Sequence, residues 1–180
     1  EMNSVPVRKV GDDKYICDLG QNMVGWCCLS LPYNPAKTIT FRYAEILDEE
    51  DQLYIENLRP ARQTDIYIHD KEKQINYEPK FTYHGFRYVE IEGLTQPPQL
   101  ECITGIMIAS SSPFVGAFEC ADKDINQLWS NILCTQWNNM ISLPTDCPQR
   151  DERSGWPGDA QVVAQNPLYT LDMAAFSTKW

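Results

Sequence analysis

The side chains best suited to chemistry gather in one short segment, residues 146–159. This segment holds four acidic residues, two arginines and one tryptophan. Carboxylates can move protons and hold hydroxyl groups, a guanidinium can fix a carboxylate or a sugar oxygen, and an indole can cover the apolar side of a ring. Such a mixture is typical of a pocket that binds and cleaves sugars.

The same segment is unsuited to regular secondary structure. Pro144 stands just before it, and Pro148, Gly155, Pro157 and Gly158 interrupt it. Neither a helix nor a central strand tolerates prolines and glycines at this density. We therefore expect a loop, and a loop with so many charges either faces solvent or forms a site.

A long amphipathic helix is expected before this loop. Asp122 is the candidate N-cap, and Pro144 follows the expected end of the helix at about residue 143. A second helical stretch is expected to begin at Asp159, pause near residues 166–167 and continue over 172–180, so that the loop joins two helices. The first helix is predicted from apolar residues that recur at steps of three and four: Ile125, Leu128, Trp129, Ile132, Leu133, Trp137, Met140 and Ile141.

Strand patterns dominate the chain before a serine run at residues 110–112. Several short segments are rich in β-branched and aromatic residues, and turn residues separate them: 37–43, 64–68, 86–91 and 102–108. Short strands at this spacing predict an antiparallel β-sandwich. We expect a sandwich domain over 1–112 and a helical domain over 113–180.

Composition excludes several classes of protein. The chain has 180 residues and a net charge of −10, so it offers no basic surface for nucleic acid. No apolar run approaches the roughly 18 residues of a membrane span.

Two histidines and seven scattered cysteines show no metal-binding spacing, so neither a metal nor a cofactor is expected. An odd number of scattered cysteines favours free thiols and a reducing compartment, and the localisation is otherwise open.

The run from Pro144 to Asp159, PTDCPQRDERSGWPGD, resembles the signature of the bacterial α-L-rhamnosidases, glycoside hydrolase family 78. Residues 18–26 resemble the opening strand of the family's sandwich, and residues 43–47 and 81–88 resemble later strands. Residues 116–120 resemble the beginning of its helical barrel. One departure is Pro157, where the family has threonine; it stiffens the loop but removes no acid.

This resemblance implies an α+β architecture: an antiparallel β-sandwich followed by the first helices of an α/α toroid of six hairpins. Such a toroid needs several hundred residues, so we expect this chain to be a fragment. Members of the family release terminal α-L-rhamnose with inversion. A rhamnose-containing carbohydrate is therefore the expected partner.

Residue roles follow from the same resemblance. Glu152 matches the general acid, and the general base is a glutamate expected beyond Trp180. By the same match, the sugar hydroxyls would be held by Asp146, Arg150 and Asp159. The indole of Trp156 would pack against the sugar ring or its methyl group.

Each of these assignments has a structural alternative. Glu152 could be a solvated acid paired with a neighbouring arginine, and Asp159 could be a helix N-cap. Trp156 could be an ordinary core residue, and Asp146 could close an Asx-turn. Cys147 is expected to be a packing residue, because no histidine lies near it in sequence to activate a thiol nucleophile.

Two alternative functions also stay open. One is a carbohydrate-binding or interaction module without catalysis, and the other is a toroid glycosidase with a different sugar specificity. The sandwich is expected to buttress the helical barrel and not to bind sugar. The apolar helix face is expected to promote self-association when the rest of the barrel is missing.

Overall fold

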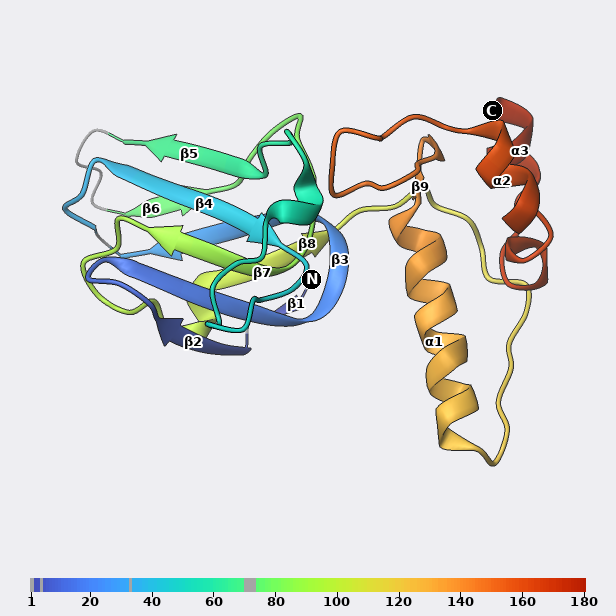
Figure 1. Cartoon of the computed structure of the whole chain (residues 1–180), viewed down its shortest axis with the longest axis horizontal. Coiled ribbons are helices and arrows are strands. Elements are labelled where there is room, and N and C mark those ends of the chain that lie inside the picture. The colour runs from blue at the N-terminus through green and yellow to red at the C-terminus, as the bar shows by residue number, and fades with distance from the viewer. Residues whose placement is uncertain (1, 4, 33, 70–73) are drawn as a thin grey trace. The chain divides into compact units, whose positions relative to one another are not determined.

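The computed structural model describes residues 2–3, 5–32, 34–69 and 74–180. The chain divides into two compact units, a strand-rich unit and a helical unit (Figure 1). The strand-rich unit contains Glu1–Met107 together with Gln149–Asp151. The helical unit contains Ile108–Pro148 and Glu152–Trp180.

Among the described residues, eight strands form the strand-rich unit, and every pairing between them is antiparallel. This confirms the antiparallel sheet expected from the sequence. The strands are β1 (Met2–Asn3), β2 (Val5–Lys9), β3 (Lys14–Leu31), β4 (Thr38–Ala44), β5 (Thr64–Ile68), β6 (Ile75–Tyr77), β7 (His84–Glu92) and β8 (Ile103–Met107). Two short 3₁₀ helices, η1 (Glu56–Leu58) and η2 (Leu100–Cys102), lie in the connections.

The long strand β3 belongs to both layers of the sandwich (Figure 1). Its first part pairs with β2 and β7, and its last part pairs with β8 and β6. The pairing register shifts between Asp18 and Met23, where Gly20 has a φ of 77°. A glycine adopts this left-handed conformation without a steric penalty, so β3 can form a bulge there, and it pairs with β7 on both sides of the bulge. Its pairing with β8 begins at Gly25.

The sandwich core is continuous and dominated by aromatic and branched side chains. Phe41, Tyr43 and Phe86 are fully buried within it. The ring of Tyr43 packs edge-on against Phe86, with 4.7 Å between the ring centroids. Truncating one of these aromatic side chains would cost about 3–5 kcal/mol of stability.

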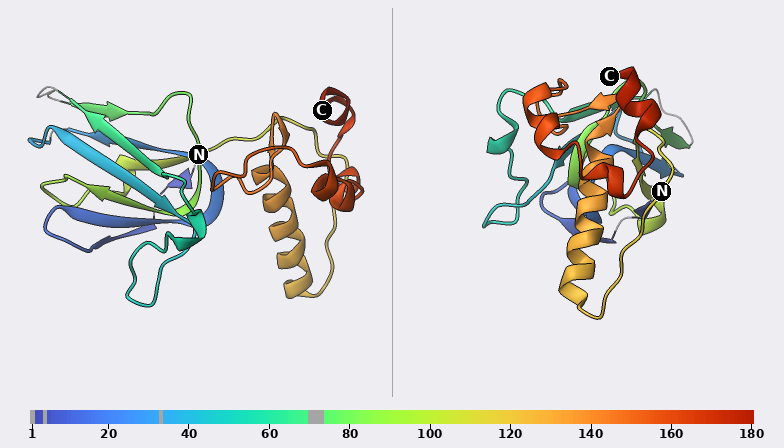
Figure 2. Two further views of the ribbon diagram at one scale, coloured as in Figure 1. Left: turned by 45° about the horizontal axis from the view of Figure 1, so that its top comes forward. Right: turned by 90° about the vertical axis from the view of Figure 1, so that its right-hand side faces the viewer.

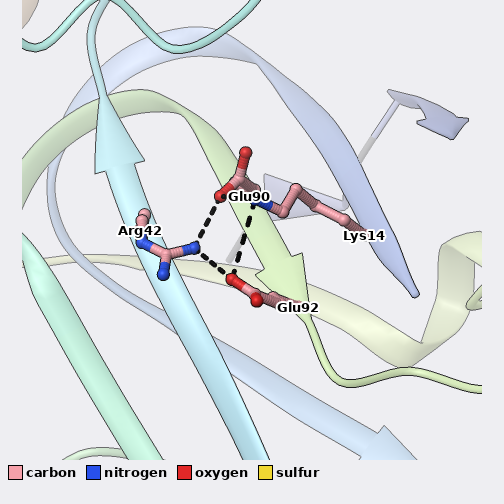
Figure 3. A network of polar contacts seen from close by, with 4 residues as sticks. All are labelled: Lys14, Arg42, Glu90 and Glu92. Atoms are coloured by element: carbon pink, nitrogen blue, oxygen red, sulfur yellow. Dashed lines mark hydrogen bonds and ion pairs between the residues drawn. The ribbon is translucent and has the colours of Figure 1, made fainter. Parts of the chain in front are cut away.

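A network of ion pairs connects β3, β4 and β7 of the strand-rich unit (Figure 3). Arg42 on β4 donates to Glu90 at 2.8 Å and to Glu92 at 2.5 Å, both on β7. Lys14 on β3 lies 3.5 Å from Glu90 and 3.7 Å from Glu92. The hydrogen bond from Arg42 is the main cause that lowers the pKa of Glu92.

The helical unit begins with a well-capped helix. Asp122 accepts hydrogen bonds from the backbone amides of Asp124 and Ile125 at 2.9 and 3.3 Å, which confirms it as the N-cap. The elements of this unit are α1 (Lys123–Asn138), β9 (Met140–Ile141), β10 (Leu143–Pro144), α2 (Pro157–Val163), η3 (Pro167–Tyr169) and α3 (Ala174–Lys179). The short hairpin β9–β10 lies at the C-terminal end of α1 (Figure 2).

Three expectations for the helical unit were wrong. Helix α1 ends at Asn138 and not near residue 143, because Asn139 closes it with a side-chain bond of 2.9 Å to the Thr135 carbonyl. The domain expected to be helical over 113–180 also contains strands, since β9 and β10 form a hairpin around Ser142, whose φ is 69°. Helix α2 begins at Pro157, a residue suited to the first turn, and not at Asp159.

A small core holds the helical unit together. It consists of Met140, Leu171, Met173 and Phe176, with Trp137 packed against them. Much of the apolar face of α1 is uncovered, and Ile125 and Leu128 are 47% and 58% exposed. Within the described residues, none of the helices combines the length and apolar character that crossing a membrane requires.

Candidate active-site loop

Residues 145–156 form no helix or strand, as the density of proline and glycine predicted. The beginning of this loop is fixed by Thr145, which is 2% exposed. Its backbone amide donates to the Asn139 carbonyl at 2.7 Å, and its hydroxyl donates to the Leu143 carbonyl at 3.2 Å. The end of α1 and the β9–β10 hairpin therefore determine where the loop starts.

The hairpin is itself tied to the rest of the helical unit. Ser110 donates its backbone amide to the Met140 carbonyl at 2.6 Å, and its hydroxyl accepts from the Ser142 amide at 2.7 Å. Lys179 of α3 donates to the Ser142 carbonyl at 2.9 Å. The start of the loop is thus supported from three separate parts of the sequence.

The loop also closes on itself within the helical unit. The backbone amide of Asp146 donates to the Ser154 carbonyl at 3.3 Å. At the next residue, a Cβ on Gly155 would lie 2.7 Å from the indole nitrogen of Trp180. The indole of Trp180 therefore packs closely against Gly155, and both ends of the acidic segment are held.

Three side chains that could bind a ligand or exchange a proton converge inside the loop. Asp146, Cys147 and Glu152 are half-buried, and one donor atom from each lies within 4.8 Å of the others. Cys147 has a φ of 47°, which is unusual for a residue other than glycine. This turn of the backbone at Cys147 brings together two carboxylates that are six positions apart in the sequence.

This group can act in proton transfer and in binding hydroxyl groups. Two neighbouring carboxylates offer acceptors for sugar hydroxyls, and either can exchange a proton. The same three atoms could serve as ligands to a cation, although a zinc site in proteins usually has four ligands. The sequence predicted only a packing role for Cys147. Its position between Asp146 and Pro148 was the one feature of the sequence that indicated a place beside the acidic residues.

The other predicted site residues lie elsewhere. Trp156 occupies the N-cap position of α2 and is 46% exposed, so it does not belong to the small core of the helical unit. Asp159 lies inside the first turn of α2 and is exposed, so it is not the N-cap. An acid there still favours the helix electrostatically. Arg150 is half-buried and belongs to the strand-rich unit.

Family models match nearly all of this chain. Residues 8–109 match the bacterial α-L-rhamnosidase concanavalin-like domain. Residues 113–180 match the six-hairpin glycosidase domain of the bacterial α-L-rhamnosidases. The chain belongs to this family. The sandwich followed by the first helices of a helical glycosidase domain is therefore its fold, as the resemblance implied.

Relatives with the name α-L-rhamnosidase agree with this assignment. One from Streptomyces avermitilis is 43% identical over 179 residues, which are 98% of this chain and 17% of that protein. Another from Formosa agariphila is 42% identical over 170 residues, 93% of this chain and 18% of that protein. The chain thus spans less than a fifth of the length of these relatives.

Solved structures show the same correspondence. The α-L-rhamnosidase from Dictyoglumus thermophilum superposes with a TM-score of 0.95 at 40% identity, over 99% of this chain and 20% of that one. The Streptomyces avermitilis enzyme complexed with L-rhamnose gives a TM-score of 0.94 at 41% identity, over 99% of this chain and 17% of that one.

Proposed function

We propose that this chain is the part of an α-L-rhamnosidase that carries the general acid, Glu152. The observation that carries the proposal is the position of the Glu152 carboxylate. It lies half-buried beside Asp146, in a loop whose two ends are held by hydrogen bonds and packing. Family membership and a relative with bound L-rhamnose support this assignment.

In the proposed reaction, Glu152 protonates the glycosidic oxygen as the bond to the sugar breaks. A second carboxylate, acting as the base, removes a proton from the attacking water. Inverting enzymes hold these two carboxyls roughly 6.5–9.5 Å apart so that the water fits between sugar and base. Asp146 lies within 4.8 Å of Glu152. It is too close to be that base, so we assign the base to residues outside this chain.

The remaining residues would bind the sugar. We assign Asp146, Arg150 and Asp159 to the sugar hydroxyls, because carboxylates and guanidinium groups form strong charge-assisted hydrogen bonds. The exposed indole of Trp156 is free of the core and offers an apolar surface to the ring or its methyl group. We also propose that the functional domains are residues 1–112 and 113–180.

Replacing Glu152 with glutamine in the full-length protein tests the proposal. On a rhamnosyl disaccharide, whose leaving group must be protonated, we expect kcat to fall by about 10²–10⁴-fold. On a nitrophenyl α-L-rhamnoside the loss should be much smaller, because that leaving group departs without protonation. Equal losses on the two substrates would contradict the role as acid.

Two further measurements separate the alternative functions. A panel of aryl glycosides distinguishes a rhamnosidase from a toroid glycosidase that acts on another sugar. Calorimetric titration with L-rhamnose tests for a binding module without catalysis: that alternative requires sugar binding by a full-length protein that releases no rhamnose. NMR of the first-formed anomer would test inversion directly.

A further inference from the structure

The segment just before Glu152 is fixed to the sandwich. Residues Gln149–Asp151 belong to the strand-rich unit. The side-chain amide of Gln63 donates to the Gln149 carbonyl. A Cβ on Gly85 would lie 2.6 Å from the Gln149 Cβ and 2.9 Å from its Cα. Gln149 is therefore held by a hydrogen bond and by a close approach that only glycine permits.

Gln63 is oriented by a buried polar network. It is 4% exposed, and its side-chain oxygen faces Nδ1 of His84, which is 3% exposed, at 2.5 Å. His84 Nε2 lies 2.9 Å from an Asp65 carboxylate oxygen, and Tyr43 donates to Asp65 at 3.0 Å. The ring of Tyr43 stacks on His84, with the ring centroids 4.1 Å apart.

The donors and acceptors of this network allow one orientation of Gln63. A backbone carbonyl can only accept, so the amide nitrogen of Gln63 must face Gln149 and its oxygen must face His84. His84 then donates from Nδ1 to Gln63, and its other nitrogen is held by Asp65. His84 was not among the site residues predicted from the sequence. It nevertheless orients the Gln63 side chain, which donates the hydrogen bond to Gln149.

We propose that Gln63 and Gly85 are positioning residues for Glu152. The segment that they hold continues directly into Glu152, which follows Gln149 by three residues. The contacts of Gln63 and Gly85 with Gln149 therefore restrict the path of the backbone that leads into Glu152. The inference rests on the proposed role of Glu152 as general acid.

Replacing Gln63 with alanine in the full-length protein tests the hydrogen bond. A misplacement of about 1 Å can cost on the order of 10²-fold in rate. We expect kcat on the rhamnosyl disaccharide to fall roughly 10- to 100-fold, with a much smaller fall on the nitrophenyl rhamnoside. The matched control is Gln52→Ala, an exposed glutamine of the sandwich unit, which should leave both rates unchanged.

Replacing Gly85 with alanine tests the close approach independently, because it crowds Gln149 and leaves the Gln63 side chain intact. It should produce the same dependence on the leaving group. Its control is Gly105→Ala, whose Cβ would meet the side chains of Leu19 and Met23 inside the core. That variant should lose thermal stability without acquiring a dependence on the leaving group.

A double-mutant cycle decides between positioning and a purely structural role. If Gln63 acts through the acid, Gln63→Ala combined with Glu152→Gln should be no slower than Glu152→Gln alone. Equal losses on both substrates for Gln63→Ala and Gly85→Ala, or additive losses in the cycle, would overturn the inference. If Glu152→Gln itself shows no dependence on the leaving group, the proposed function fails first, whatever the Gln63 variant does.

Discussion

At the scale of single residues, the carboxylate of Glu152 lies close to a carboxylate that is distant from it in the sequence. Asp146 lies six positions earlier, yet the two carboxylates come within 4.8 Å of each other. The unusual backbone conformation of Cys147 permits this approach. The composition of the loop predicted which chemistry is present, whereas the path of the backbone decides which side chains can act together.

Trp156 should contribute to sugar preference in the full-length protein. The exposed indole is expected to contact the methyl group that distinguishes L-rhamnose from L-mannose. A methyl-sized contact in an apolar pocket is worth roughly 10- to 200-fold in discrimination. We expect Trp156→Ala to reduce the ratio of kcat/KM for aryl α-L-rhamnoside over α-L-mannoside by about tenfold. Trp156→Phe keeps an apolar ring and should retain most of the ratio; an unchanged ratio in both variants would remove Trp156 from the sugar site.

Cys147 should not take part in bond cleavage, although its sulfur lies beside Glu152. A rhamnosidase that uses two carboxylates has no step for a thiol. We expect Cys147→Ser to keep kcat on the rhamnosyl disaccharide within a few-fold of the parent, and a thiol-alkylating reagent to leave that variant active. A loss as large as that of Glu152→Gln would instead assign the thiol a role in the reaction.

At the scale of elements, the sequence predicted correctly those strands and helix ends that a strong local pattern determines. The strand β5 has the predicted bounds 64–68, and Asp122 caps α1. The end of α1 was missed because Met140 continues the helical spacing while belonging to a strand. The pair Asn138–Asn139 carried the stop signal, since asparagine is common at helix C-termini. The hairpin that follows depends on contacts with Ser110 and Lys179, and local sequence does not report such contacts.

The ion pairs across β4 and β7 predict a dependence of stability on pH (Figure 3). The folded pKa of Glu92 is lowered, chiefly by its hydrogen bond with Arg42, below the ordinary value of the unfolded chain, about 4.3. A lowered folded pKa stabilises the protein above the unfolded pKa, and this stabilisation is lost as pH falls through the folded pKa. Both side chains are more than a third exposed, so water screens the pair to about 0.2–1 kcal/mol.

Thermal unfolding of the 180-residue chain, followed by circular dichroism between neutral and acidic pH, measures this effect. Glu92→Gln should melt at a lower temperature than the parent near neutral pH, by up to about 2–4 °C. The difference should vanish as the pH drops below about 4. Glu49→Gln, an exposed acid after β4, is the control. A difference that stays constant or grows on acidification would show that the charge of Glu92 is not its cause.

At the scale of the whole molecule, the two units differ in how completely they bury their apolar residues. Among the residues that the structure describes, the sandwich core contains fifteen buried residues, whereas the core of the helical unit contains four. Large apolar side chains are exposed over the helical unit: Phe114, Val115, Phe118, Ile125, Leu128, Val162, Val163, Leu168 and Tyr169. This chain spans 17% and 20% of two of these relatives, and we propose that further helical hairpins cover these side chains in the complete enzyme.

Residues 1–180 alone should therefore neither hydrolyse rhamnosides nor remain monomeric. Inverting hydrolysis needs carboxyls on both sides of the sugar, and Asp146 is too near Glu152 to act from the opposite side. Exposed apolar patches of this extent promote association. An assay with nitrophenyl α-L-rhamnoside, combined with light scattering on the same sample, measures both properties.

Replacing Leu128 and Val162 with aspartate, both exposed on the helical unit, should shift the sample toward monomer without restoring activity. Clear turnover by a monodisperse monomer would contradict the proposal, because the base would then have to lie within these residues, with Asp159 as the first acid to replace.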